Sequence, residues 1–231
     1  MTFTTLATIA ALSRSDPSAA PPAGLRTFGT GRSEFKVSTV ETTVFEHSVP
    51  SGSFGVFTHF WITGAPSPGG GIDNATVRYY LDGEARPSIE FKPPLAAGVG
   101  FDDLTVWGTS KAAHGAKDGA WTLKYRIPFQ RSARVTIQHP SGVDRLGRSP
   151  DPPLTCYLIV RGTENLPLPL GGVYLPGSTA RLSLHKIESE TFEPLAWVPL
   201  LDLSSGTGAI FQTTLAIQSG NKNFLEACYH L

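Results

Sequence analysis

Short runs of β-branched, aromatic and aliphatic residues recur along this chain, separated by turns rich in Gly, Pro, Asn and Asp. Runs of this length and composition are typical of β-strands. The expected strands cover residues 35–39, 43–46, 55–63, 75–81, 88–91, 123–128, 133–139 and 154–161. Eight strands at this spacing predict an all-β sandwich of the jelly-roll type, in which two antiparallel sheets pack face to face.

The pattern begins again after residue 165. A connector rich in Pro and Gly at 166–172 is followed by strand-like runs at 180–187 and 195–203 and by a hairpin at 209–231. These runs predict the beginning of a second sheet system.

We therefore expect an all-β fold of two tandem jelly-roll β-sandwiches, the second one incomplete. An N-terminal arm occupies residues 1–32, the first jelly roll residues 33–165, and the start of the second residues 166–231. The sequence ends inside a strand, with Tyr229 and Leu231 on an apolar edge. We expect either that another chain covers this edge, giving a homo-oligomer, or that the sequence is a fragment.

The last strand places one acidic residue among apolar neighbours. In an extended strand Phe224, Glu226, Cys228 and His230 share one face, because side chains alternate between the two faces. Spacing alone leaves two interpretations of Glu226 open: a solvated carboxylate on the outer side of a strand, or a functional carboxylate in a site.

Composition and charge limit the classes of partner expected for this chain. With 24 Gly, 19 Pro and one Met the chain is poor in helix-forming stretches, and 19 acidic residues balance 19 basic ones. No basic stripe appears, so we expect no nucleic-acid partner, and no apolar run reaches the roughly 20 residues that a membrane span needs. Cys156 and Cys228 lack metal-ligand spacing, so we expect free thiols, no metal and no cofactor. The compartment stays open.

The segment 92–120 is too long for a plain hairpin, and long loops of this kind often form part of a site. It contains Trp107 and His114, which we expect in the wall of a binding site. Trp61, Trp107 and Trp121 are candidates for stacking on sugar rings, although Trp61 belongs to a strand with the pattern of a core strand.

Four segments resemble glycoside hydrolase family 172, and the similarity extends over about residues 44–231. They are FTHFWIT at 57–63, YLDGEARPS at 80–88, IPFQRSA at 127–133 and GAIFQTTLAIQSGNKNFLEACYHL at 208–231. In the family these correspond to the first core strand, an Asp-Gly-Glu hairpin, a Pro-Phe-Lys/Arg-Ser segment, and the segment whose Phe-Leu-Glu motif carries a catalytic carboxylate.

The resemblance implies tandem jelly rolls assembled as trimers or pairs of trimers. It also implies hydrolysis of α-linked fructofuranosides or arabinofuranosides with retention of configuration. Glu226 is then one of two catalytic carboxylates, with Trp107, His114 and His230 as expected substrate-binding residues. The expected ligand is a carbohydrate.

Retaining hydrolysis needs two carboxyl groups about 5 to 5.5 Å apart. In the family the second comes from a Gly-Thr-Glu-Asp-Tyr motif that follows the first, and these 231 residues hold no such motif after Glu226. Residues 206–208 match only part of this motif and precede Glu226. The acidic residues Glu188, Glu190 and Glu193 belong to a charged loop. We expect the 231-residue chain to lack glycosidase activity. The alternative is a non-catalytic jelly roll that binds carbohydrate or serves in assembly.

Overall fold

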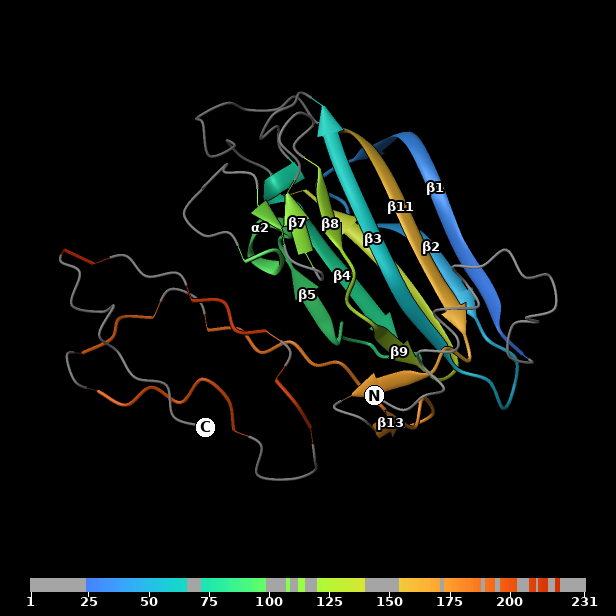
Figure 1. Cartoon of the computed structure of the whole chain (residues 1–231). Helices are drawn as coiled ribbons and strands as arrows, with labels where there is room; N and C mark the ends of the chain where they lie inside the picture. Colours follow the sequence, from blue (N-terminus) through green and yellow to red (C-terminus); the bar gives the residue numbers. More distant parts are fainter. Residues whose placement is uncertain are drawn as a thin grey trace.

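A computed structural model describes most of the first 176 residues and parts of the chain beyond. The described residues are 24–65, 72–98, 107–108, 112–114, 120–139, 154–170, 173–187, 190–193, 196–202, 208–210, 212–215 and 219–220. Antiparallel β-sheets dominate them, as the strand pattern predicts (Figure 1).

The larger sheet has seven strands. Its order is β1 (Arg26–Val37), β11 (Leu154–Glu164), β3 (Gly55–Ala65), β8 (Trp121–Leu123), β7 (Ala112–His114) and β6 (Trp107–Gly108), and β9 (Ile127–Phe129) also pairs with β3. β8 and β9 pair with successive parts of β3, around Trp61 and around Val56. They therefore act as one strand interrupted at residues 124–126, where the sequence pattern predicts a continuous strand.

The smaller sheet has four strands, in the order β2 (Thr42–Ser48), β10 (Ser132–Gln138), β4 (Thr76–Leu81) and β5 (Ile89–Phe91). The remaining elements are the 3-10 turn η1 (Ile72–Asn74), the short helix α2 (Pro93–Ala96), and a hairpin of β12 (Leu168–Leu170) and β13 (Val173–Leu175). None of the helices in these described parts is long and apolar enough to cross a membrane.

The strand order fits a jelly roll. With β8 and β9 counted as one strand and the β6–β7 hairpin set aside, the central strands run first, eighth, third and sixth in one sheet, and second, seventh, fourth and fifth in the other. Successive strands thus alternate between sheets at the start of the chain and again at its return, as in a pair of Greek keys.

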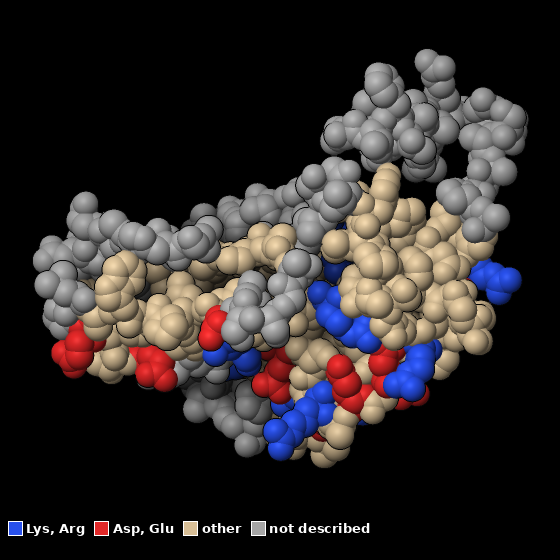
Figure 2. Space-filling model, turned by 90° about the horizontal axis from the view of Figure 1, so that it is seen from below, with Lys and Arg blue, Asp and Glu red and all other residues tan. Residues whose placement is uncertain are grey.

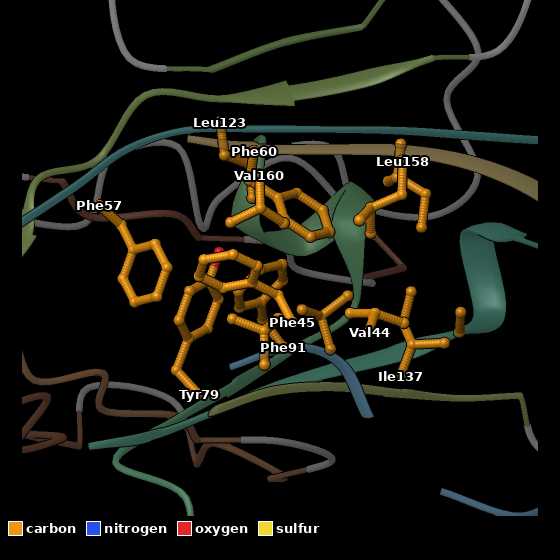
Figure 3. Close-up of a cluster of buried hydrophobic side chains, with 14 of the residues drawn as sticks. Val44, Phe45, Phe57, Phe60, Tyr79, Phe91, Leu123, Ile137, Leu158 and Val160 are labelled. Atoms are coloured by element: carbon orange, nitrogen blue, oxygen red, sulfur yellow. The ribbon is translucent and has the colours of Figure 1, made fainter. Parts of the chain in front are cut away.

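The core lies between the two sheets, where aromatic side chains from both converge (Figure 3). Phe57 of the larger sheet meets Tyr79 of the smaller one edge to face, with ring centroids 5.2 Å apart. Burial alternates strictly along β4 and along most of β11, so a period of two decides which side chains enter the core. Each large apolar side chain buried in this way stabilises the fold by about 1.5–3 kcal/mol.

Cys156 belongs to this core as a buried free thiol, as the sequence predicts. Burial raises the pKa of its thiol to about 12, against a lowering by the charge of Lys36. It therefore packs as a small apolar residue. Cys228 lies outside the described residues.

The Asp-Gly-Glu and Pro-Phe-Gln-Arg-Ser segments meet at one end of the sandwich. Asp82, in the turn after β4, has φ 57° and accepts hydrogen bonds from the backbone N–H groups of Gln130 (2.7 Å) and Arg131 (2.6 Å). Its other carboxylate oxygen binds Arg181 at 2.7 Å. These contacts give the Asp-Gly turn a structural role that needs no ligand.

The structure corrects the expected strands at both ends. β1 begins at Arg26, inside the predicted arm, whose first 23 residues lie outside the description. The described residues at 180–187, 196–202 and 212–215 form no strand, although strands were predicted there. They run as an extended segment beside the sandwich (Figure 1). This segment exposes apolar side chains, Trp197 most of all at 77%.

Candidate functional site

The predicted catalytic carboxylate, Glu226, lies outside the described residues together with its strand neighbour His230. Of the other carboxylates weighed from the sequence, Glu190 and Glu193 are exposed in a part of the chain without regular structure. Because Glu226 lies outside the description, its pairing with another carboxylate stays a prediction, and the site is built from what the two sheets present.

Two predicted substrate-binding residues are brought together by strand pairing. Trp107 of β6 lies directly opposite His114 of β7, and His114 in turn lies opposite Trp121 of β8. The three positions form one row that continues to Ile62 of β3. Sequence separation alone did not predict this row, because it depends on the pairing of two strands only two and three residues long.

For Trp121 and Trp61 the structure reverses the burial that the sequence suggested. Trp121 is fully buried, and its indole N–H donates a 2.6 Å hydrogen bond to the buried Asp73 carboxylate, so it is not available to stack on a sugar. Trp61, predicted in the core, is only partly buried. Its neighbours Phe60 and Ile62 enter the core, so the alternation of β3 turns Trp61 to the outer face of the seven-stranded sheet.

An open hollow of about 610 Å³ lies on this outer face, across β1, β11 and β3. We call it the outer-face hollow. Its lining is mostly threonine and glycine, with Arg161 and Ile159: Thr27, Phe28, Gly29, Thr30, Gly31, Thr58, Ile159, Arg161, Gly162 and Thr163. Figure 1 shows the three strands side by side. Ile159 pairs directly with Trp61, so Trp61 is the cross-strand neighbour of a residue that lines the hollow.

Glycine shapes the hollow at β1. Gly29 pairs with Arg161 of β11. A Cβ at Gly29 would collide with the carbonyl oxygen of Val160 and lie 3.3 Å from Cγ of Arg161. The absence of a side chain therefore lets the aliphatic stem of Arg161 lie against the backbone of β1.

His59 stands beside this arginine, directly opposite it on β3. Desolvation lowers the pKa of the His59 imidazole, and the charges of Arg161 and Lys124 lower it further. The ring is therefore neutral at pH 7, with one donor and one acceptor nitrogen. The outer-face hollow thus offers hydroxyls and a guanidinium, and an indole and a neutral imidazole occupy the paired positions on β3 beside it.

The opposite outer face, on the four-stranded sheet, carries its own polar cluster around Arg78. The guanidinium donates from Nε to Glu90 at 2.6 Å and from Nη1 to Gln138 at 2.8 Å, and lies 3.4 Å from Glu41. Glu41 also accepts hydrogen bonds from Tyr80 and Thr136: Tyr80 at 2.8 Å, Thr136 at 2.6 Å. We call this group of residues the Arg78 network.

The two carboxylates of the Arg78 network are poor candidates for an acid and base pair. Burial raises the pKa of Glu41, but the hydrogen bonds from Thr136 and Tyr80 and the charge of Arg78 outweigh it, and the pKa is lowered overall. The hydrogen bond from Arg78 lowers the pKa of Glu90, against desolvation. Both are therefore ionised at pH 7, whereas a general acid needs a raised pKa.

On the face seen from below in Figure 2, charges of both signs are interspersed. Figure 2, which shows the molecule from below, has Lys and Arg side chains next to Asp and Glu side chains. The buried Glu164 is held 3.0 Å from His47, which links β11 to β2 of the other sheet. Within the residues that the structure describes, no three His, Cys, Asp or Glu side chains gather as metal ligands.

No known family model matches this chain, and no curated protein matches it either.

Proposed function

We propose that this chain is a carbohydrate-binding jelly-roll unit whose ligand lies in the outer-face hollow. The observation that carries the proposal is the partly exposed indole of Trp61 beside a hollow lined by threonine hydroxyls and Arg161. A sugar ring offers an apolar face of C–H groups and a rim of hydroxyls. An aromatic ring satisfies the first, and convergent donors and acceptors satisfy the second.

The polar groups of the hollow suit hydroxyl ligands. Each threonine hydroxyl can donate one hydrogen bond and accept others, Arg161 can donate, and the neutral ring of His59, beside the hollow, can do both. Threonine side chains on a strand are also stiff about χ1, so little conformational entropy is lost when they bind. A face of this kind favours recognition of a sugar chain over chemistry on it.

Binding to immobilised arabinan and inulin tests the proposal, because these neutral polymers contain the furanosides that the family resemblance implies. We expect Trp61→Ala to weaken binding at least tenfold, since aromatic stacking and area burial are both lost. Tyr174→Ala is the matched control, because Tyr174 is 50% exposed and does not line the hollow. Equal binding by wild type and Trp61→Ala would refute the assignment of the face.

A second candidate is the retaining α-furanosidase implied by the resemblance, built from two tandem jelly rolls. The jelly-roll strand order of the described sheets and the meeting of two family-like segments at Asp82 favour it. In this proposal Glu226 is one catalytic carboxylate and the protein works as a homo-oligomer. We expect no turnover of a nitrophenyl arabinofuranoside by the 231-residue chain. Turnover that Glu226→Gln abolishes would contradict this expectation.

A further inference from the structure

The outward-facing positions that pair across β1, β11 and β3 differ in their charge from the Arg78 network, which includes Glu41 and Glu90. They include the cations Lys36 and Arg161 and no acidic residue, and Lys124 follows β8 on the same side as His59. The nearest acid along β1 is Glu34, in the bulge beyond Arg32. At these paired positions of the described strands, a ligand therefore meets cations and no carboxylate.

Arg161 is the one charged residue among the described residues that line the outer-face hollow. It is exposed, and no carboxylate or carbonyl oxygen of the described chain accepts a hydrogen bond from its guanidinium. Arg78, on the other sheet, shares its guanidinium among Glu41, Glu90 and Gln138. A guanidinium with no acceptor among the described residues keeps its planar fork of donors for a carboxylate of the ligand.

The spacing places this fork next to the indole. Trp61 pairs with Ile159, and Arg161 follows Ile159 by two residues on the same face of β11. Such diagonal neighbours are about 7–8 Å apart. A sugar ring stacked on Trp61 can therefore direct an acidic substituent, or that of the adjoining ring, toward Arg161.

We propose that the outer-face hollow selects glycans that contain uronic acid, with Arg161 binding the uronate carboxylate beside a ring stacked on Trp61. This inference rests on the carbohydrate-binding function proposed above and adds the class of sugar. Neutral sugars satisfy the threonine hydroxyls but leave the Arg161 fork without its best partner. The uronate supplies both the ring and the anion.

The test uses one polymer in two charge states: polygalacturonate and its fully methyl-esterified form, which has the same backbone without the charge. Binding of the 231-residue protein is measured by calorimetry at 50 and 200 mM NaCl. We expect the ester to bind roughly tenfold to hundredfold more weakly, because hydrogen bonds to a charged group contribute about 1.5–3 kcal/mol. Arg161→Gln should lose the preference for the acid, and Arg161→Lys should keep only part of it.

Arg86→Gln is the matched control, because Arg86 is an exposed arginine in the turn between β4 and β5, on the other sheet. Equal affinity of wild type for the acid and the ester overturns the inference and leaves the carbohydrate-binding function standing. Equal affinity for polygalacturonate and double-stranded DNA also overturns it, since that result indicates general polyanion binding. If the wild-type protein binds none of the four polymers (arabinan, inulin, polygalacturonate and its methyl ester), both proposals are overturned. Wild type alone decides these outcomes, so none depends on a variant that folds poorly.

Discussion

The two outer faces of the sandwich use the same kinds of side chain in opposite ways. On the four-stranded sheet Arg78 is saturated by Glu41, Glu90 and Gln138, and Arg134 lies 4.0 Å from the Tyr80 ring centroid. On the seven-stranded sheet Arg161 has no such partner in the described chain. A satisfied network stabilises its own sheet, whereas donors left open on a rigid face are available to a ligand.

The largest expected effect comes from disrupting the Arg78 network on the four-stranded sheet. Arg78→Met leaves the Glu90 carboxylate without its main partner and removes the cation 3.4 Å from Glu41, so we expect a loss of about 2 kcal/mol in the free energy of unfolding. Urea denaturation measures it, with the exposed Arg86→Met as control, expected to change stability by less than about 0.5 kcal/mol. Sugar binding should be unchanged. A simultaneous loss of binding would contradict the separation of the two faces.

The difference between the two faces can also be removed on the seven-stranded sheet, by giving Arg161 an acidic partner. Thr163 lies two residues along β11 and lines the same hollow. Thr163→Glu should pair with Arg161 and weaken polygalacturonate binding about tenfold, while Thr163→Gln, of the same size without charge, weakens it much less. Similar losses in both variants would mean that shape, and not charge, governs the site.

A smaller effect is expected from His59. Because its pKa is lowered, the ring gains charge only as the pH falls through that lowered value, and a third cation then joins Arg161 and Lys124. We expect polygalacturonate affinity to rise about threefold between pH 7 and pH 5, since nearby like-signed cations add modestly to an exposed site. The rise should be absent in His59→Gln. An affinity that falls with acidification would contradict the placement of His59 beside the ligand.

The smallest effect concerns the pH dependence of the Arg78 network. A carboxylate whose pKa is lower in the folded than in the unfolded state stabilises the fold above the unfolded pKa and loses this contribution as the pH falls through the folded one. Glu90 is of this kind, and its side chain is 37% exposed. Glu90→Gln should therefore cost about 0.5 kcal/mol at pH 7 and nothing near pH 2, as measured by urea unfolding at both values. A difference in unfolding free energy between wild type and Glu90→Gln that is the same at both pH values would contradict the lowered pKa of Glu90.

Alternating patterns predicted most of the sandwich and missed what depends on pairing. The predicted strands at 43–46, 75–81, 133–139 and 154–161 correspond closely to β2, β4, β10 and β11. One side of β4, β10 and β11 is apolar over these residues, whereas β2 buries the consecutive residues Val44 and Phe45. The first part of β1 was missed, since TFGTGRS contains two glycines and one apolar residue. Its strand conformation comes from pairing with β11, 120 residues and more away.

The candidate site was hidden for the same reason. In residues 57–63 Phe57, Phe60, Trp61 and Ile62 are all apolar, so alternation could not separate the inner from the outer face. The register of β3 against β11 separates them, and it shifts between Arg161 and Gly162. Glycines that form a hollow have no hydrophobic signal in sequence. The pairing of Thr27 with Thr163 can be recognised only from the register of β1 against β11.

The four tryptophans allow the most direct test of which face binds sugar, because each gives one indole N–H signal in a ¹⁵N NMR spectrum. Titration with polygalacturonate oligomers should shift the Trp61 signal. The signal of Trp121, which is buried and hydrogen-bonded to Asp73, should stay in place. A Trp61 signal that remains unmoved at saturation, while binding is observed by calorimetry, would contradict the account.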